Sequence, residues 1–133
     1  MAIMKVYWDS SALVEATINP QLRTRLRHEK GLTRTHALAE IFAALTGNPQ
    51  FRFDADYATL TVEELAEDLE FTDLSSAEVI SALKTAKRKG VRGGRVHDLL
   101  HAAAADKSGA KELLTIDTND FEGLPEKAQL TRV

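Results

Sequence analysis

The chain has 133 residues, enough to bury a hydrophobic core, and it contains no cysteine. Disulfides, thiolate metal sites and cysteine nucleophiles are therefore excluded. The 17 Lys and Arg residues and the 20 Asp and Glu residues give a net charge of −3, which excludes a strongly basic nucleic-acid-binding protein. The apolar runs are too short for a membrane helix, and no signal-peptide pattern opens the chain. We therefore expect a single cytoplasmic domain over residues 1–133, without membrane association.

The predicted elements alternate between strands and helices. Strands are expected at residues 3–8, 32–33, 71–72, 113–116 and 130–133. Helices are expected from residue 12, at 21–29, at 36–45, from 61, at 75–89 and from 96 to about 109, with capping boxes at 61–64 and 75–78. Residues 50–57 read as an exposed loop, and Gly93-Gly94 as a flexible turn. This order predicts an α/β fold in which helices flank a central parallel sheet.

Two acidic residues follow predicted strands. Asp9 comes directly after the first strand, and Asp117 follows the strand that ends at Ile116, with Asp120 close behind. In parallel α/β sheets, ligands bind beyond the carboxyl ends of the strands. Each of these acids also has a simpler interpretation, because aspartate often caps the turn or helix that follows a strand.

Two further acids lie in alanine-rich helices. Glu40 is the only acidic residue between Gly31 and Phe53, and its helix neighbours include four alanines, so we expect it to project into a confined space. Asp98 begins the helix that contains four consecutive alanines, and it points away from the apolar stripe of that helix. The simpler interpretations are a solubilising charge for Glu40 and a helix-dipole contact for Asp98.

The chemistry of these acids depends on whether they converge, which the residue pattern leaves open. Carboxylates about 4 Å apart repel one another by about 4 kcal/mol per pair at an effective dielectric constant of 20, so a shared pocket requires protons or a cation. A site with oxygen ligands and no thiolate favours Mg²⁺ or Mn²⁺. Such sites usually act on phosphates, which favours metal-assisted phosphodiester hydrolysis.

Four segments in order resemble the PIN-domain family, and more narrowly the VapC toxins of toxin–antitoxin pairs. These segments are residues 6–13, the helix with Glu40, residues 96–104 and residues 114–121. The resemblance implies an α/β/α sandwich and RNA cleavage that depends on Mg²⁺ or Mn²⁺. It also implies inhibition by a VapB-type antitoxin and a homodimer. The catalytic, metal-binding cluster that it implies consists of Asp9, Glu40, Asp98 and Asp117.

The resemblance also implies roles for residues around these acids. Asp120 would hold a second ion or a water, and Ser10 and Thr115 would provide hydroxyl groups that orient the carboxylates. A basic segment over residues 84–95 runs directly into Asp98. We expect it to hold the RNA backbone, with Lys89, Arg92 and Arg95 as the binding residues. The acidic segment over residues 54–78 is expected to lie away from the RNA.

Three alternatives stay open on the residues alone. The first is a PIN-like domain without catalysis that binds RNA or serves as a scaffold. The second is a zinc hydrolase that uses His97 and His101, which share a helix face but lack an evident third ligand; otherwise these histidines are expected at the surface. A receiver or phosphatase domain is disfavoured, because Asp9 is followed by two serines and no lysine closely follows the 113–116 strand.

Overall fold

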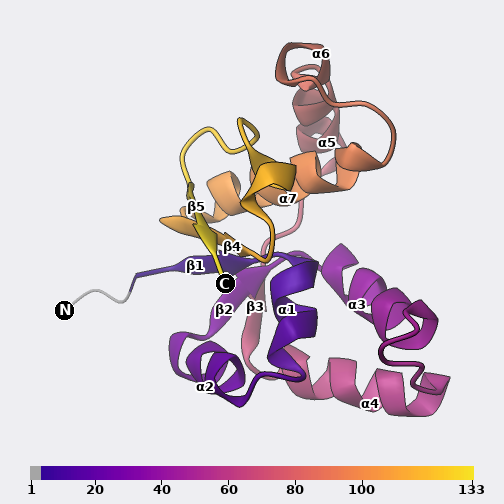
Figure 1. Ribbon diagram of the computed structural model, residues 1–133. Helices are drawn as coiled ribbons and strands as arrows, with labels where there is room; N and C mark the ends of the chain where they lie inside the picture. Colours follow the sequence, from indigo (N-terminus) through magenta and orange to yellow (C-terminus); the bar gives the residue numbers. More distant parts are fainter. Residues whose placement is uncertain (1–3) are drawn as a thin grey trace.

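The computed structural model describes residues 4–133, which form a parallel sheet covered by helices on both faces (Figure 1). All neighbouring strands pair in parallel, in the order β3-β2-β1-β4-β5. The strands are β1 (Val6–Trp8), β2 (Gly31–Thr33), β3 (Leu69–Phe71), β4 (Glu112–Thr115) and β5 (Gln129–Arg132). The predicted α/β architecture is thereby confirmed.

The helices divide between the two faces of the sheet. One face is covered by α1 (Ser10–Ala16), α2 (Pro20–Glu29), α3 (His36–Gly47) and α4 (Ala55–Ala66) (Figure 1). The other face carries α5 (Ser76–Leu83), α6 (Ala86–Lys89) and α7 (Val96–Ser108), with the short 3₁₀ turns η1 (Gly93–Arg95) and η2 (Thr118–Phe121).

The central strand explains how two cores form. Successive side chains of a strand point to opposite faces. Trp8 accordingly packs with the helices α1 to α4, whereas Tyr7 packs with α7 on the other face. Leu114 and Leu113 of the neighbouring strand divide in the same way. Because both faces of β1 and β4 are covered, these strands are apolar without alternation, as parallel strands usually are.

Two expectations for the middle of the chain are wrong. Residues 50–57 are not a simple exposed loop, since Phe51 and Phe53 pack against the core beneath α4. The helix α4 begins at Ala55, where the Asp54 side chain accepts a hydrogen bond from Tyr57 N at 2.8 Å. Thr61 therefore lies inside the helix instead of capping it, and its hydroxyl donates to the Tyr57 carbonyl. Residues 61–64 have the spacing of a capping box, but the helix already begins after Asp54, which caps it.

The second capping box is confirmed, but the helix that it opens is shorter than expected. Ser75 and Glu78 bond reciprocally at the start of α5. The helix then breaks at Thr85, whose hydroxyl donates to the Ala82 carbonyl at 2.7 Å and competes with regular helical bonding. Gly90 ends α6 in the left-handed conformation, and the predicted turn at Gly93-Gly94 forms the start of η1.

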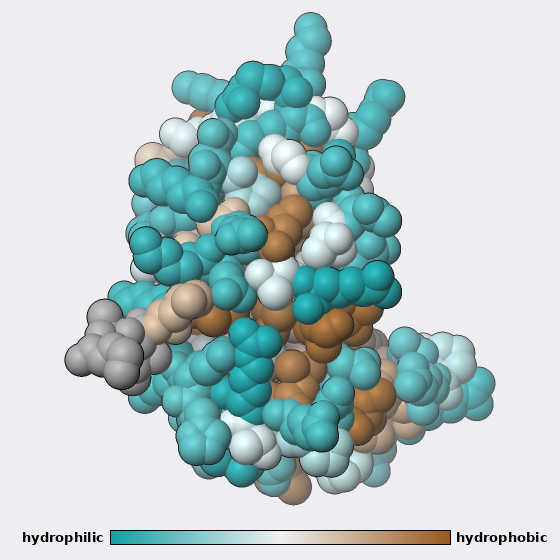
Figure 2. Space-filling view, turned by 60° about the vertical axis from the view of Figure 1, so that its left-hand side comes forward, coloured by the Kyte–Doolittle hydropathy of each residue, from teal (hydrophilic) through white to brown (hydrophobic). Residues whose placement is uncertain are grey.

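The surface is mostly hydrophilic. On the face shown in Figure 2, hydrophilic residues dominate above and below, and hydrophobic residues appear in a band across the middle. No described helix is long and apolar enough to cross a membrane.

Candidate active site

The candidate site lies at the carboxyl edge of the sheet, where β1 and β4 end side by side. Trp8 pairs with Leu114, so Asp9 directly follows the paired residue of one strand and Thr115 that of the other. The helices α1 and α3 start at this edge because each follows a strand. The helix α7 also starts here, because it runs back across the sheet before β4. The topology therefore places the first turns of α1, α3 and α7 at the same sheet edge as Asp9.

The Asp9 carboxylate is buried and fixed by three hydrogen bonds. One oxygen, Oδ1, accepts from Ala12 N at 2.8 Å and from the Ser11 hydroxyl at 2.7 Å. The other oxygen, Oδ2, accepts from the Thr115 hydroxyl at 2.7 Å. Burial raises the pKa of Asp9, although these three hydrogen bonds favour the charged form. Asp9 thus caps α1, as its simpler interpretation suggested, and at the same time presents a rigid carboxylate at the sheet edge.

The serine that contacts Asp9 is Ser11 instead of Ser10. The Ser11 hydroxyl also lies 3.3 Å from the Thr115 hydroxyl and accepts a hydrogen bond from Ile116 N at 3.2 Å. Ser11 therefore ties the end of β4 to the start of α1, while Thr115 contacts Asp9 as the resemblance implied.

Asp98 is half-buried and lies in the electrostatic neighbourhood of the other acids. Burial and the nearby negative charges of Asp120, Asp9 and Glu40 raise this pKa from 3.8 to about 6, against the opposing effect of His101. Since such charge effects fall off with distance, these four carboxylates share one neighbourhood. The small residues Ala102, Ala104 and Ala105 are fully buried, which lets α7 pack closely on the sheet and brings Asp98 to its edge.

The two acids after β4 differ in their surroundings. Asp117 is exposed, and its Oδ1 accepts a hydrogen bond from Asn119 N at 2.9 Å, which caps η2. Asp120 is also exposed, but its charge is the largest one acting on Asp98. The structure therefore brings Asp120 into the acidic neighbourhood more clearly than Asp117.

A buried relay of hydrogen bonds supports Glu40. Its Oε1 lies 2.7 Å from His101 Nε2, and the Tyr7 hydroxyl lies 2.7 Å from His101 Nδ1. Burial works to raise the pKa of Glu40, but the His101 hydrogen bond and the neighbouring histidines outweigh it and lower the pKa. A carboxylate only accepts hydrogen bonds, so Nε2 carries the hydrogen. Burial raises the pKa of Tyr7, which keeps its hydroxyl protonated for donation to Nδ1.

This relay corrects the interpretation of the histidine pair. His101 is not at the surface: it is 1% exposed, and both of its ring nitrogens have partners within the protein. His97 is exposed and stacks on His36 of α3, with ring centroids 5.4 Å apart. His97 and His101 therefore do not form a joint zinc site. Sequence reasoning also missed Tyr7 and His36, because no local pattern connects them to the acids.

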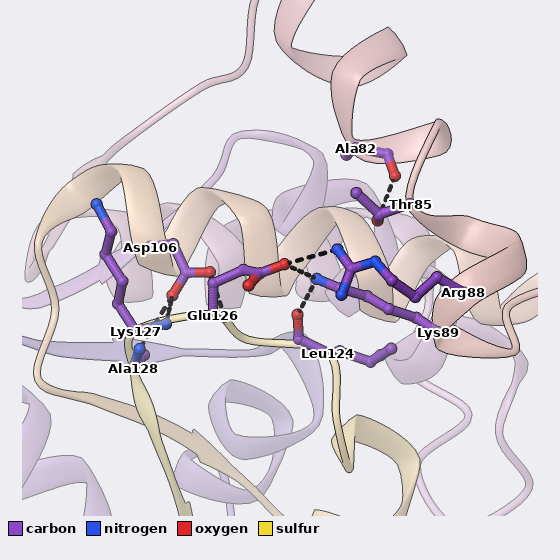
Figure 3. A network of polar contacts seen from close by, with 9 residues as sticks. All are labelled: Ala82, Thr85, Arg88, Lys89, Asp106, Leu124, Glu126, Lys127 and Ala128. Carbon is purple, nitrogen blue, oxygen red and sulfur yellow. Dashed lines mark hydrogen bonds and ion pairs between the residues drawn. The ribbon is translucent and has the colours of Figure 1, made fainter.

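The basic residues before α7 have different roles. The expectation that Lys89 contacts RNA is wrong, because its side chain is only 7% exposed. Its ammonium donates to the Leu124 carbonyl at 2.7 Å and pairs with Glu126 at 3.0 Å (Figure 3). Arg95 donates to the carbonyls of Gly90, Asp120 and Glu122, so it anchors the segment that carries Asp120. Arg92 is exposed in extended backbone and remains suited to contact a ligand.

The other charged segments are partly paired with each other. Arg23 of α2 bonds to Asp68 at 2.7 Å, and Lys107 of α7 bonds to Glu78 at 2.7 Å. Part of the acidic segment 54–78 thus neutralises basic residues of neighbouring helices.

A hollow of about 310 Å³ adjoins the acids. It lies between α1 and α3, with Ser11, Glu40, Phe51 and Ile116 in its walls. A substrate that reaches the carboxylates can therefore place a neighbouring group here.

Comparison with known proteins agrees with this architecture. The family model described as "PIN domain" matches residues 6–127. The chain belongs to the PIN-domain family. Among solved structures, the PIN-domain chain is similar to the crystal structure of PAE2754 from Pyrobaculum aerophilum, with 19% identity and a TM-score of 0.70 over 96% of this chain and 90% of that one. This similarity supports the fold, and no curated protein matched the chain.

PIN domains are typically metal-dependent nucleases. The donor set of this PIN domain fits such a metal, because the acids whose charges act on Asp98 offer carboxylate oxygens and the chain has no thiolate.

Proposed function

We propose that this chain is an endoribonuclease that hydrolyses RNA phosphodiester bonds with Mg²⁺ or Mn²⁺, and that residues 1–133 act as one PIN domain. The observation that carries the proposal is the environment of Asp98, where burial and the nearby charges of Asp120, Asp9 and Glu40 together raise the pKa to about 6. Uncompensated carboxylates are costly, and a divalent cation is the ordinary compensation.

Asp9 and Asp98 are the first residues that we assign to holding the cation, with Glu40 and Asp120 beside them and Asp117 at the rim. A bound cation would neutralise phosphate charge and lower the pKa of an attacking water. The protein's own contribution is rigidity, since Thr115, Ser11 and Ala12 fix Asp9 before any ligand arrives. Arg92 is proposed to hold the RNA backbone, and Arg95 to position Asp120.

The biological setting is also a proposal. The resemblance of the four acidic segments to VapC toxins supports a role as the toxin of a VapBC pair, acting in the cytoplasm, inhibited by a VapB-type antitoxin and assembled as a homodimer. A catalytically silent scaffold is the second candidate, but the acids are all present, which favours the enzyme.

The test is cleavage of a mixed pool of structured RNA with Mg²⁺, with Mn²⁺ or with a chelator. We expect cleavage only with the ions, and its loss in Asp9→Asn and Asp98→Asn proteins purified identically. Asp56→Asn, an exposed acid on α4, is the matched control and should cut like the wild type. Asp120→Asn should lose more activity than Asp117→Asn, because Asp120 acts more strongly on Asp98.

Equal cleavage by the wild type and both site variants would identify a contaminating nuclease and contradict the proposal. If no RNA is cut and Asp98→Asn binds as much Mn²⁺ as the wild type, the scaffold function replaces the enzymatic one. Arg92→Ala should weaken RNA binding. The slope of log affinity against log salt concentration should become shallower by about 1, which corresponds to the loss of one phosphate contact.

A further inference from the structure

A second set of possible metal ligands lies beside the acids and has a different chemistry. His36, Glu40 and His97 each offer one ligand atom, and these atoms all lie within 4.8 Å of one another. His36 and Glu40 are four residues apart on α3 and so share one helix face, whereas His97 comes from the first turn of α7. Three ligands from two elements of the fold therefore meet at one place.

The imidazole rings of His36 and His97 lie next to each other. The rings of His36 and His97 are nearly parallel, at an angle of 12°. Both side chains are exposed, so they can turn toward a common centre without disturbing the core. Ligand atoms around a tetrahedral Zn²⁺ lie about 3.3 Å apart, given bonds of about 2 Å, so a small rotation of each side chain closes the site.

The third ligand is already positioned. Glu40 Oε1 is bound to His101 Nε2 at 2.7 Å, and His101 is held by the Tyr7 hydroxyl. Outer hydrogen bonds of this kind orient metal-ligating side chains and preserve their charge. The contact with His101 uses only Oε1, so Glu40 can still offer a carboxylate oxygen to a cation near His36 and His97.

We propose that His36, Glu40 and His97 form a binding site for a divalent transition-metal ion of the Zn²⁺ type, adjoining the carboxylate cluster and sharing Glu40 with it. Imidazole suits zinc, cobalt and nickel better than magnesium, which prefers oxygen ligands. Two histidines and a glutamate leave one coordination position for water or a substrate group. Zinc binding by these three residues does not require the protein to be a nuclease.

The test is Zn²⁺ binding by the full chain at neutral pH, measured by competition with a coloured chelator. We expect one Zn²⁺ per chain. His36→Gln and His97→Gln should each weaken binding by more than about tenfold, since even the loss of an outer hydrogen-bonding partner costs that much. His28→Gln, which changes an exposed histidine of α2, is the matched control and should bind like the wild type.

A second measurement identifies the ligands directly. Co²⁺ added in place of Zn²⁺ should give a visible spectrum with imidazole coordination that His97→Gln abolishes and Asp98→Asn preserves. Circular dichroism checks that the glutamine variants are folded, which their exposed positions favour.

Several outcomes would overturn the inference. These are an absence of Zn²⁺ binding, equal binding by the histidine variants, and binding lost only in Asp98→Asn. The last result would place the ion on the carboxylates, so the new site would fail while the proposed nuclease centre stands. Conversely, zinc binding that needs the histidines in a protein without nuclease activity would support this site alone.

Discussion

At the scale of single residues, the site depends on hydroxyl groups as much as on acids. Asp9 is nearly fully buried, and a buried carboxylate is stable only when its oxygens are hydrogen-bonded. Thr115 is the sole donor to Asp9 Oδ2 among the hydrogen bonds of the described residues. The Thr115 hydroxyl therefore stabilises the charged form of Asp9 and fixes the orientation of its carboxylate.

Replacing Thr115 by valine tests this dependence, because valine keeps the shape and removes the hydroxyl. Without the donor, the pKa of Asp9 should rise further and the carboxylate should lose its fixed orientation. We expect Mn²⁺ affinity, measured by isothermal titration calorimetry at neutral pH, to fall about 10–100-fold, as for other outer-sphere substitutions.

The control is Thr59→Val, because Thr59 is exposed and its hydroxyl donates only to the Ala55 carbonyl of its own helix. This variant should keep the wild-type affinity for Mn²⁺. Unchanged affinity in Thr115→Val would mean that Asp9 is not a metal ligand or that Ser11 and Ala12 suffice to hold it.

Residue patterns single out the acids as candidates but do not predict what surrounds them. Asp9 is recognisable because ligands bind beyond the carboxyl ends of parallel strands, and Asp98 because it points away from the apolar stripe of an alanine-rich helix. The resemblance implied Ser10, but the chain turns after Trp8 so that Ser11 contacts Asp9. His97 and His101 share a helix face, yet the first turn of α7 reaches solvent and the next is buried, so their environments differ. Only the fold brings His36 to His97.

At the scale of elements, strands and long helices were predictable and their junctions were not. Apolar runs and glycine or proline boundaries located all five strands approximately. The pattern is clearest for β1 and β2, whose residues are all buried, and weaker for the edge strands β3 and β5, which are partly exposed. The break between α5 and α6 was missed because it arises from the Thr85 hydroxyl and from α6 packing near the 124–128 loop, which is a tertiary effect.

The loop after η2 holds α6 and α7 together. Asp106 of α7 accepts hydrogen bonds from three successive backbone N–H groups, those of Glu126, Lys127 and Ala128 (Figure 3). Lys89 of α6 reaches the same loop at Leu124 and Glu126. The 124–128 loop thus connects Lys89, inside the basic segment, with the carboxyl-terminal half of α7.

Lys89→Met should consequently destabilise the protein instead of weakening RNA binding alone. Methionine retains the aliphatic length but leaves the Leu124 carbonyl without its donor, which should cost about 1–3 kcal/mol of unfolding free energy. Urea denaturation measures this loss, and Lys87→Met, a change at an exposed lysine of the same helix, should be nearly neutral. If Lys89→Met keeps full stability and RNA affinity falls, the original RNA-binding assignment of Lys89 is right.

At the scale of the whole molecule, the acidic cluster links metal binding, pH and stability. The pKa of Asp98 is about 6 in the folded protein against an ordinary value of 3.8. The folded state therefore holds a proton that the unfolded chain releases, and the resulting stabilisation is fully present below pH 3.8. It is lost as the pH rises through about 6, where the metal-free protein begins to carry the cost of a partly buried charge and the repulsion from the neighbouring carboxylates.

Asp98→Asn removes this repulsion and makes the linkage measurable by thermal unfolding. In a chelator, the variant should melt at a higher temperature than the wild type at about pH 8, and the difference should shrink at about pH 4.5, where Asp98 is protonated and resembles asparagine. Mn²⁺ at about pH 8 should reverse the order, because an ion that binds only the folded state stabilises the protein with the intact ligand set more. Asp56→Asn should follow the wild type throughout. Equal melting temperatures for the wild type and Asp98→Asn at both pH values would mean that neither burial nor the neighbouring carboxylates make the Asp98 charge costly, and the reason for placing a cation there would disappear.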